Sequence, residues 1–313
     1  MQPHGIHHLT AVSADVRDNK RFCTEVLGLR LVKRSVNQDD VSAYHLFYAD
    51  GAGSPGTDLT FFDWDVPRER RGGHAFERTG LRVRDAATLH AWEARLREHG
   101  VDLDAPREID GRWELPFRDP EGQRYALVVD DGRGDDPVPW EHGPVPSDQQ
   151  IRGLGPVQAT VRATGPSEAL LVDAFGLRHD RSYLRDGHDV HVYAMGDGGA
   201  HAELHLRIDP TIDIARPGAG GVHHLALRVH DQDYEAWARR LNDAGVPNSG
   251  PVDRFWFRSL YARDRNGLLF ELATDGPGFA VDEDPATLGE TVVLPPFLEA
   301  RRDQIVSGLT PLD

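Results

Sequence analysis

Short runs in which apolar and polar residues alternate make up most of the chain, and segments with the apolar spacing of amphipathic helices lie between them. The order strand, helix and several strands occurs four times, in units that begin near residues 5, 75, 152 and 221. The pattern therefore predicts an α+β protein. The predicted strands include 7–13, 80–83, 157–162 and 224–229, and the predicted helices include 16–27 and 167–175.

Two of the four units match closely. The segment VRDAATLHAWEARLREHGV, which begins at Val83, matches VHDQDYEAWARRLNDAGV, which begins at Val229. In both copies an Asp precedes the helical pattern and a Gly follows it, as is typical of helix ends. Chance alternation of strands and helices would not reproduce individual residues in this way. The four units are therefore predicted to be internal repeats.

A stretch rich in Pro, Gly and Asp, residues 131–150, predicts a connection between two halves of the chain. One βαβββ unit cannot close a sheet alone, whereas two units together can curl into a cup. We therefore predict four βαβββ units that form two cup-shaped mixed sheets, with ligands on the concave faces. The expected division is an N-terminal half at 1–135, a linker at 136–150, a C-terminal half at 151–280 and a tail at 281–313.

Composition narrows the class of protein. The 313 residues include 35 Lys and Arg against 51 Asp and Glu, which gives a formal net charge of −16. This charge disfavours nucleic acid and anionic membranes as partners, because both would be repelled. The single cysteine, Cys23, excludes an intrachain disulfide, and no apolar run reaches the roughly 20 residues that span a bilayer. The start MQPHGIHHLTAV shows no secretory pattern, so a cytoplasmic protein is expected.

Two histidine pairs occupy equivalent places in the repeats. His7-His8 and His223-His224 each stand at the start of the first strand of a unit, in units one and four. Adjacent strand residues point to opposite faces, so both members of a pair can reach one site only through a bulge or a strong twist. The equivalent places in units two and three are expected at Glu77-Arg78 and near Val157-Gln158.

Glu271 lies in the otherwise apolar run LLFELA of unit four. A carboxylate is costly to bury unless it is paired with a charge or bound to a cation. With His8 and His224 it completes two imidazoles and one carboxylate, the facial ligand set of non-haem Fe(II) oxygenases. The pattern favours this metal site over half-exposed histidines and a Glu271 paired with an arginine. The expected counterparts of Glu271 are Phe61 in unit one, Ala126 in unit two and Glu203, opposite Gln158, in unit three.

Longer motifs extend the pattern over nearly the whole chain. They are GIHHLTAV, the segment Phe22–Asp40, GTDLTFFDW, WEHGPVPSDQQIRGLG, GGVHHLALRV, DRFWFRSLY, LLFELATDGPGF and LPPFLEARR. With these motifs and both histidine pairs, the chain resembles the vicinal oxygen chelate superfamily, and within it the ring-cleaving dioxygenases that act on hydroquinones and chlorinated hydroquinones. The resemblance implies that superfamily's fold of four βαβββ units in two cup-shaped sheets.

The resemblance also implies an Fe(II)-dependent enzyme, with Mn(II) as the alternative metal, that opens a dihydroxylated aromatic ring with O2. The diol and O2 are the implied partners, and a homo-oligomer is compatible with the sequence. The implied metal ligands are His8, His224 and Glu271. The implied catalytic residues are His223 and His7, as acid or base, together with Arg254 and Tyr261, which would stabilise a phenolic oxygen. Substrate binding is implied for Thr10, Phe255 and Phe257.

Two other functions stay open. A glyoxalase-type lyase or isomerase would use the metal only as a Lewis acid, and such sites usually need a second Glu at the place where Phe61 stands. A non-catalytic small-molecule binding protein of the same fold would have lost its metal. The retention of His8, His224 and Glu271 argues against that second alternative.

Overall fold

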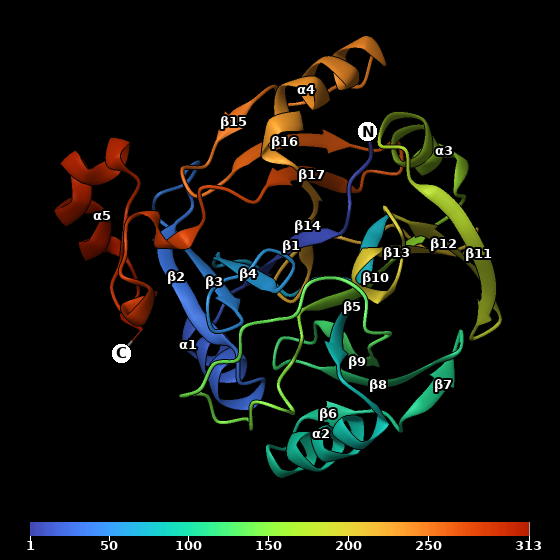
Figure 1. Cartoon of the computed structure of the whole chain (residues 1–313), viewed down its shortest axis with the longest axis horizontal. Helices are drawn as coiled ribbons and strands as arrows, with labels where there is room; N and C mark the ends of the chain where they lie inside the picture. Colours follow the sequence, from blue (N-terminus) through green and yellow to red (C-terminus); the bar gives the residue numbers. More distant parts are fainter. Residues whose placement is uncertain (313) are drawn as a thin grey trace.

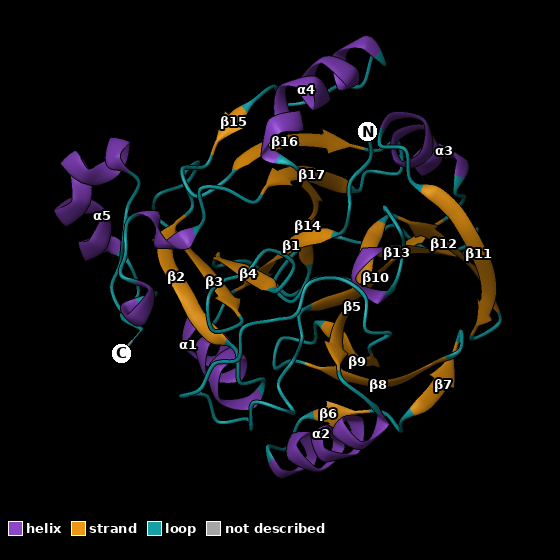
Figure 2. Cartoon of the chain, in the orientation of Figure 1, coloured by secondary structure: helices purple, strands orange, loops and turns teal. Residues whose placement is uncertain are grey.

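Two curled mixed sheets form the protein in the computed structural model, which describes residues 1–312 (Figure 1). Helices lie on the outer side of both sheets, and the order strand, helix and strands recurs four times along the chain (Figure 2). The predicted α+β class and the two mixed sheets built from repeats are therefore confirmed. Among residues 1–312, no helix is long and apolar enough to cross a membrane.

The first sheet joins unit one to unit four. Its strands follow the order β15-β16-β17-β14-β1-β4-β3-β2. At its centre β1 of unit one pairs antiparallel with β14 of unit four, and each of these strands pairs parallel with the last strand of its own unit. The strands are β1 Ile6–Ser13, β2 Arg30–Val36, β3 Tyr44–Ala49, β4 Asp58–Asp63, β14 Val222–Val229, β15 Val252–Asp253, β16 Arg258–Arg263 and β17 Leu269–Thr274.

The second sheet joins unit two to unit three in the same manner. Its order is β11-β12-β13-β10-β5-β9-β8-β6, and β7 pairs with β8. The central pair is β5 with β10, again antiparallel. The strands are β5 Ala75–Val83, β6 Asp102–Leu103, β7 Arg107–Ile109, β8 Arg112–Arg118, β9 Arg124–Val129, β10 Leu154–Val161, β11 Arg178–Arg185, β12 His188–Ala194 and β13 Glu203–Ile208. Each half of the chain thus contributes one unit to each sheet.

The register of the first sheet corrects one predicted correspondence. Ala226 of β14 lies beside Glu271 of β17, and the equivalent pair in unit one is Thr10 of β1 beside Thr60 of β4. The counterpart of Glu271 is therefore Thr60. The predicted counterpart, Phe61, is wrong by one position and points to the opposite face of the sheet.

The register of the second sheet corrects another correspondence. Gln158 of β10 lies beside His205 of β13. Glu203, which was expected opposite Gln158, lies two residues earlier in β13, so that expectation is wrong. When β10 is aligned with β1 through these registers, Gly155-Pro156 of unit three stands where unit one has its histidine pair. The predicted position, near Val157-Gln158, is therefore wrong by two residues.

The matching units match because their helices pack alike. Asp85 caps α2 of unit two, and Asp15 caps α1 of unit one, since each side chain accepts a hydrogen bond from a backbone N–H three residues later. In unit four the aspartates at the start of the helix make no such bond, so the Asp cap expected there is wrong. Trp92 and Trp237 stand at equivalent places of α2 and α4 and are both buried against the sheets. The α-helices are α1 Val16–Arg21, which continues as a π-helix over Phe22–Val26, α2 Ala86–Glu98, α3 Gly165–Glu168, which continues as a π-helix over Ala169–Ala174, α4 Tyr234–Asp243 and α5 Arg302–Gly308.

The C-terminal tail packs beside β2 of the first sheet (Figure 1). Lys33 of β2 is fully buried, and its ammonium group donates to the backbone oxygen of Phe279 at 2.9 Å and to Asp282 at 2.8 Å. It also contacts the carboxylate of Glu283. A buried ammonium group is stable only when it is paired in this way. Lys33 therefore fixes the start of the tail on the sheet that carries the histidine pairs.

Candidate metal centre

Three side chains converge beside the central strands of the first sheet. His8 comes from β1, His224 from β14 and Glu271 from β17, and these strands are neighbours in the sheet. All three side chains are buried, with Glu271 at 0% exposure. The structure thus brings together the three residues that the repeats and the apolar run single out.

The three facing atoms form a triangle of nearly equal sides. His8 Nε2 lies 3.2 Å and His224 Nε2 lies 2.9 Å from Glu271 Oε2, and the two nitrogen atoms are 3.3 Å apart. Ligand atoms at right angles around an ion, with bonds of roughly 2.1 Å, lie about 3.0 Å from each other. The triangle therefore fits one face of an octahedral metal ion.

β-Bulges place both histidines of each pair at this site. The register between β1 and β14 shifts between Ile6 and His8, and again between Thr10 and Ala11, so His7 and His223 are the extra residues. The Nδ1 atom of His8 lies 2.9 Å from Nδ1 of His7, and that of His224 lies 2.7 Å from Nδ1 of His223. His7 and His223 therefore contact the Nδ1 sides of the two candidate ligands, where residues that orient metal-binding histidines usually lie.

The electrostatics favour a free Nε2 on each ligand. Burial, and then the neighbouring ligand histidine, lower the pKa of His7 and of His223 to about 3, so both rings are neutral at pH 7. A neutral ring can accept a hydrogen bond from the ligand's Nδ1–H. With Nδ1 protonated, the Nε2 lone pair of each imidazole would be available to a cation held between the two rings and Glu271.

Glu271 is ionised although it is fully buried. Burial raises the pKa of this carboxyl, but His8 and His224 outweigh that effect and hold the pKa well below its usual range. Its Oε1 atom accepts a hydrogen bond from Ser259 at 2.5 Å, while Oε2 faces the two imidazoles. Within residues 1–312, the nitrogen atoms that lie closest to its carboxylate belong to these histidines and not to an arginine. The arginine-paired alternative is therefore wrong, and an anionic, metal-type donor set remains.

A small cavity of about 30 Å³ opens beside the triangle. Tyr261 and Arg254 line it, and Arg254 Nε donates to the Tyr261 hydroxyl at 3.2 Å. Burial raises the pKa of Tyr261, so its hydroxyl stays protonated at neutral pH. The other lining residues include Asn37, Gln38, Asp39, His45, Phe47, Phe62, Trp256 and Phe257.

The remaining expected residues take different places. Phe257 forms part of the wall, with its ring 5.2 Å from that of His8. Phe255 is not among the lining residues, and Trp256 takes that place. Thr10 lies 3.1 Å from His224 Nε2 through its hydroxyl, so it contacts a ligand rather than the open cavity. His7 and His223 do not line this cavity either, and His223 faces a larger one of about 360 Å³.

Sequence reasoning missed His45 and the loop that closes the cavity. His45 Nε2 lies 3.1 Å from Thr60 Oγ1, and burial, followed by His8 and His224, lowers its pKa well below the usual value. Asp39 forms an ion pair with Arg254 at 2.8 Å, and Gln38 donates to the Arg254 backbone oxygen at 2.8 Å. The sequence did contain a signal for this loop, because residues 37–40 end the motif Phe22–Asp40. No functional role was predicted for them.

Comparison with known proteins places these features in a wider group. The model of the Glyoxalase/Bleomycin resistance protein/Dioxygenase superfamily matches residues 5–127 and 153–272. The chain is 41% identical to the Bacillus subtilis protein named "Putative ring-cleaving dioxygenase MhqA", over 100% of both chains. It is 30% identical to the "Chlorohydroquinone/hydroquinone 1,2-dioxygenase" of Sphingobium indicum, over 96% of this chain and 94% of that protein.

Solved structures give the same grouping. A crystal structure of a "putative dioxygenase" from Bacillus subtilis superposes with a TM-score of 0.91 at 33% identity, covering 100% of this chain and 98% of that one. Glyoxalase I from Zea mays superposes with a TM-score of 0.63 at 16% identity, covering 87% and 92%. The maize protein shares the fold alone.

Proposed function

The chain belongs to the glyoxalase/bleomycin resistance protein/dioxygenase superfamily, and from this premise we propose that it is a metal-dependent dioxygenase that cleaves the ring of a hydroquinone-type substrate with O2. The observation that carries the proposal is the buried triangle of His8, His224 and Glu271. The names of its full-length relatives, which include a hydroquinone dioxygenase, support the substrate class.

The donor set suits Fe(II), with Mn(II) as the alternative. Two neutral imidazoles and one carboxylate on one face of an octahedron leave the other face open to substrate and O2. A redox-active ion held there would let the electron-rich ring pass electrons to O2, which a Zn²⁺ or Mg²⁺ ion would not do. An extradiol type of cleavage follows from this ligand set and is part of the proposal.

The wall of the cavity would hold and orient the ring. The protonated Tyr261 hydroxyl, fixed by Arg254, can donate a hydrogen bond to a phenolic oxygen and stabilise charge there. Phe257, Trp256 and Phe47 supply apolar surface that excludes water from the ring face. The role proposed for Phe255 from the resemblance passes to Trp256, because Trp256 lines the cavity.

We propose His45 for the acid or base role that the resemblance implied for His7 and His223. Those two rings contact the ligands' Nδ1 atoms and do not line the cavity, so their proposed role is to orient the ligands. His45 does line it, and its lowered pKa keeps the ring neutral, with a free nitrogen, at neutral pH.

The two alternative functions have less support. A glyoxalase-type centre would need a fourth protein ligand, and the position equivalent to Glu271 in unit one holds Thr60. A binding protein without a metal would have no reason to keep an ionised carboxylate buried between two imidazoles.

Oxygen uptake tests the proposed function. The protein is loaded anaerobically with Fe(II) and mixed with hydroquinone, chlorohydroquinone or catechol. We expect one O2 consumed per diol, with loss of the aromatic absorption band, and a higher rate for the para-diols. Protein loaded with Zn²⁺ is the control and should be inactive. Failure of all three diols to consume O2 above this control would refute the proposal.

The ion pair between Asp39 and Arg254 predicts a salt-dependent substrate entry. A cavity of about 30 Å³ holds only two or three waters, so the loop must move to admit a ring. Asp39 is 72% exposed, and such pairs contribute up to about 1 kcal/mol, or roughly fivefold. We expect kcat/KM of the wild type to rise with ionic strength by up to that factor, because salt screens the pair.

The variant Asp39→Asn separates this effect from general salt effects. Its kcat/KM should start near the high-salt value of the wild type and stay flat as salt is added. The control Asp18→Asn, at an exposed pair with Arg21, should behave as the wild type. An Asp39→Asn variant that keeps the full salt dependence would contradict a gating role of the pair.

A further inference from the structure

The second sheet has its own cavity, at the place equivalent to the metal centre. Gly80 lies beside Ala126 as Ala226 lies beside Glu271, so Arg78 of β5 stands where His224 stands in β14. A cavity of about 40 Å³ opens there, lined by Arg78, Gln158 and Arg185 among others. The cation-binding centre of the first sheet is thus replaced by a guanidinium group.

The charges around this cavity are those of an anion site. Its lining holds three guanidinium groups, from Arg78, Arg112 and Arg185, against the two carboxylates of Asp110 and Glu114. Arg112 pairs with Glu203 and Asp110 pairs with Arg181, so within the lining both Arg78 and Arg185 face the carboxylate of Glu114. A buried positive excess favours binding of a negative ligand.

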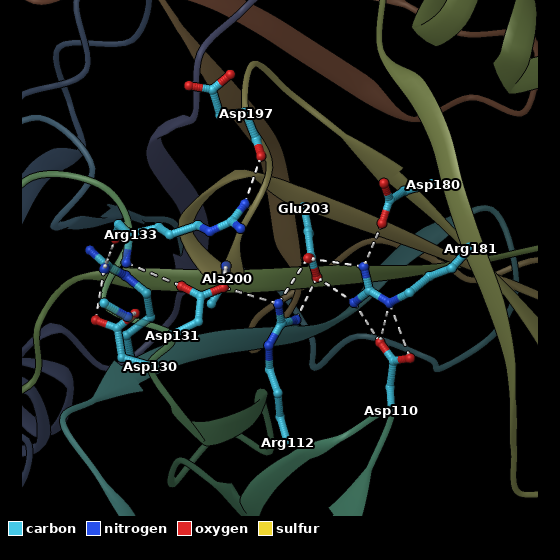
Figure 3. Close-up of polar contacts among 12 residues, drawn as sticks. Asp110, Arg112, Asp130, Asp131, Arg133, Asp180, Arg181, Asp197, Ala200 and Glu203 are labelled. Carbon is cyan, nitrogen blue, oxygen red and sulfur yellow. Dashed lines mark hydrogen bonds and ion pairs between the residues drawn. The ribbon is translucent and has the colours of Figure 1, made fainter.

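The carboxylates near the cavity are already occupied by other arginines. Figure 3 shows Arg112 and Arg181 on either side of Glu203. Their shortest contacts with Glu203 are 2.6 and 3.0 Å, and Arg181 also contacts Asp110 at 2.6 Å. Although Asp110 and Glu203 gather with His205 in a metal-like cluster, these guanidinium groups take the place of a cation. The cluster is therefore a closed ion-pair network.

Arg78 has only one long contact of this kind with the residues that the structure describes. Glu114 accepts hydrogen bonds from Arg185 at 2.6 Å and from Arg107 at 2.8 Å, and it lies 3.9 Å from Arg78. Nε and Nη1 of Arg78 are buried and have no hydrogen-bond partner among residues 1–312, and the same holds for Nε of Arg185. Burying a charged donor without an acceptor costs free energy, so we expect a ligand to supply acceptors for these atoms.

An acceptor atom in the same lining is also unused. Gln158 lies beside Arg78 in the register, is 4% exposed and has a buried Oε1 atom with no hydrogen-bond partner in the described part of the chain. A ligand that fills the cavity would therefore accept hydrogen bonds from Arg78 and donate one to Gln158. Burial, and then Arg185, lower the pKa of Arg78 only to about 10, so it stays charged at neutral pH.

We propose that this cavity binds a small planar carboxylate-type anion that carries one hydroxyl group, of which bicarbonate is the simplest example. Its carboxylate oxygens accept from the N–H groups of Arg78 and Arg185, and its hydroxyl donates to Gln158. The volume of about 40 Å³ corresponds to roughly three or four water-sized groups, which matches four heavy atoms.

Binding of labelled bicarbonate tests the site directly. Sodium [13C]bicarbonate is titrated at pH 8 into the metal-loaded full chain, with chloride used to keep ionic strength constant, and its 13C line width is followed. We expect broadening by the wild type and by the control Arg84→Gln, whose guanidinium group is 50% exposed. Arg78→Gln should weaken binding roughly tenfold or more. Its metal content and ring-cleavage activity should be unchanged, because the metal centre lies in the other sheet.

Two further binding measurements, with formate and with Gln158→Leu, test which groups of the ligand are recognised. Formate lacks the hydroxyl group, so it should bind several-fold more weakly than bicarbonate, and Gln158→Leu should abolish this difference. Gln158→Leu also keeps the test valid if Arg78→Gln does not fold, as judged by circular dichroism. The proposal is overturned if the wild type causes no broadening, if chloride competes equally, or if formate binds as well as bicarbonate. Binding that persists in Arg78→Gln and disappears with EDTA would belong to the metal centre and would also overturn it.

Discussion

Replacing Glu271 with Gln is expected to abolish stable metal binding and to lower ring cleavage more than about a hundredfold. Loss of residues that only orient metal ligands typically costs about 10–100-fold, and Glu271 would bind the metal directly. The amide removes the negative charge that balances the cation, and its NH2 group would face two imidazole nitrogens that lie 2.9 and 3.2 Å from the carboxylate oxygen.

Metal analysis and thermal unfolding measure this effect separately from activity. Fe(II) should raise the Tm of the wild type, because it binds the folded chain alone, and should leave the Tm of Glu271→Gln unchanged. The control Glu98→Gln removes the same charge from an exposed place on α2 and should bind metal normally. If Glu271→Gln retains a full equivalent of iron and its activity, the assignment of Glu271 as a ligand is wrong.

Replacing Tyr261 with Phe is expected to lower kcat roughly a hundredfold without loss of metal. The change deletes the hydroxyl of a residue that lines the cavity and keeps the ring, so packing should be preserved. Removal of one donor that stabilises developing negative charge typically costs about 10²–10³-fold in kcat. Because burial raises the pKa of Tyr261, its hydroxyl remains a donor throughout the neutral range, and no loss of activity from its ionisation should be seen there.

Arg254 supplies the matched comparison for Tyr261. Arg254→Lys keeps the charge but loses the forked contacts to Tyr261 and Asp39, so we expect a smaller fall in kcat and a weaker salt dependence of kcat/KM. The double variant should be no worse than Tyr261→Phe alone if Arg254 acts by holding the hydroxyl. Steady-state kinetics at fixed iron content measures all three. A kcat of Tyr261→Phe within twofold of the wild type would exclude a donor role.

The repeats explain why the triad could be predicted from the sequence. His8 and His224 occupy equivalent positions in two copies of the same unit, and Glu271 interrupts an apolar strand, so each carries a signal that is independent of tertiary structure. The counterpart in unit one was placed at Phe61 instead of Thr60, because parallel register shifts by single residues that composition does not mark.

Other features depended on contacts between distant units. The sequence shows four units but not which of them share a sheet, since all four have similar central strands. His45 looked like one of many scattered histidines until β3 placed it beside Thr60. Asp39 gains its role only from an arginine 215 positions away. The roles of His45 and Asp39 depend on contacts that form only in the folded sheet, so the local pattern of apolar and polar residues does not predict them.

The pairing of unit one with unit four also sets an order of events during synthesis. β1 pairs with β14, and His224 of β14 lies 216 residues after His8 of β1. β1 therefore stays unpaired until β14 has been synthesised. At roughly 5–20 residues per second, the ribosome needs about 10–40 s to make that stretch. Units two and three are neighbours in the chain and can complete the second sheet meanwhile. The growing chain must shield the apolar edge of β1 until then, and a chain cut short before β17 would leave two histidines on the ribosome with no carboxylate to join them.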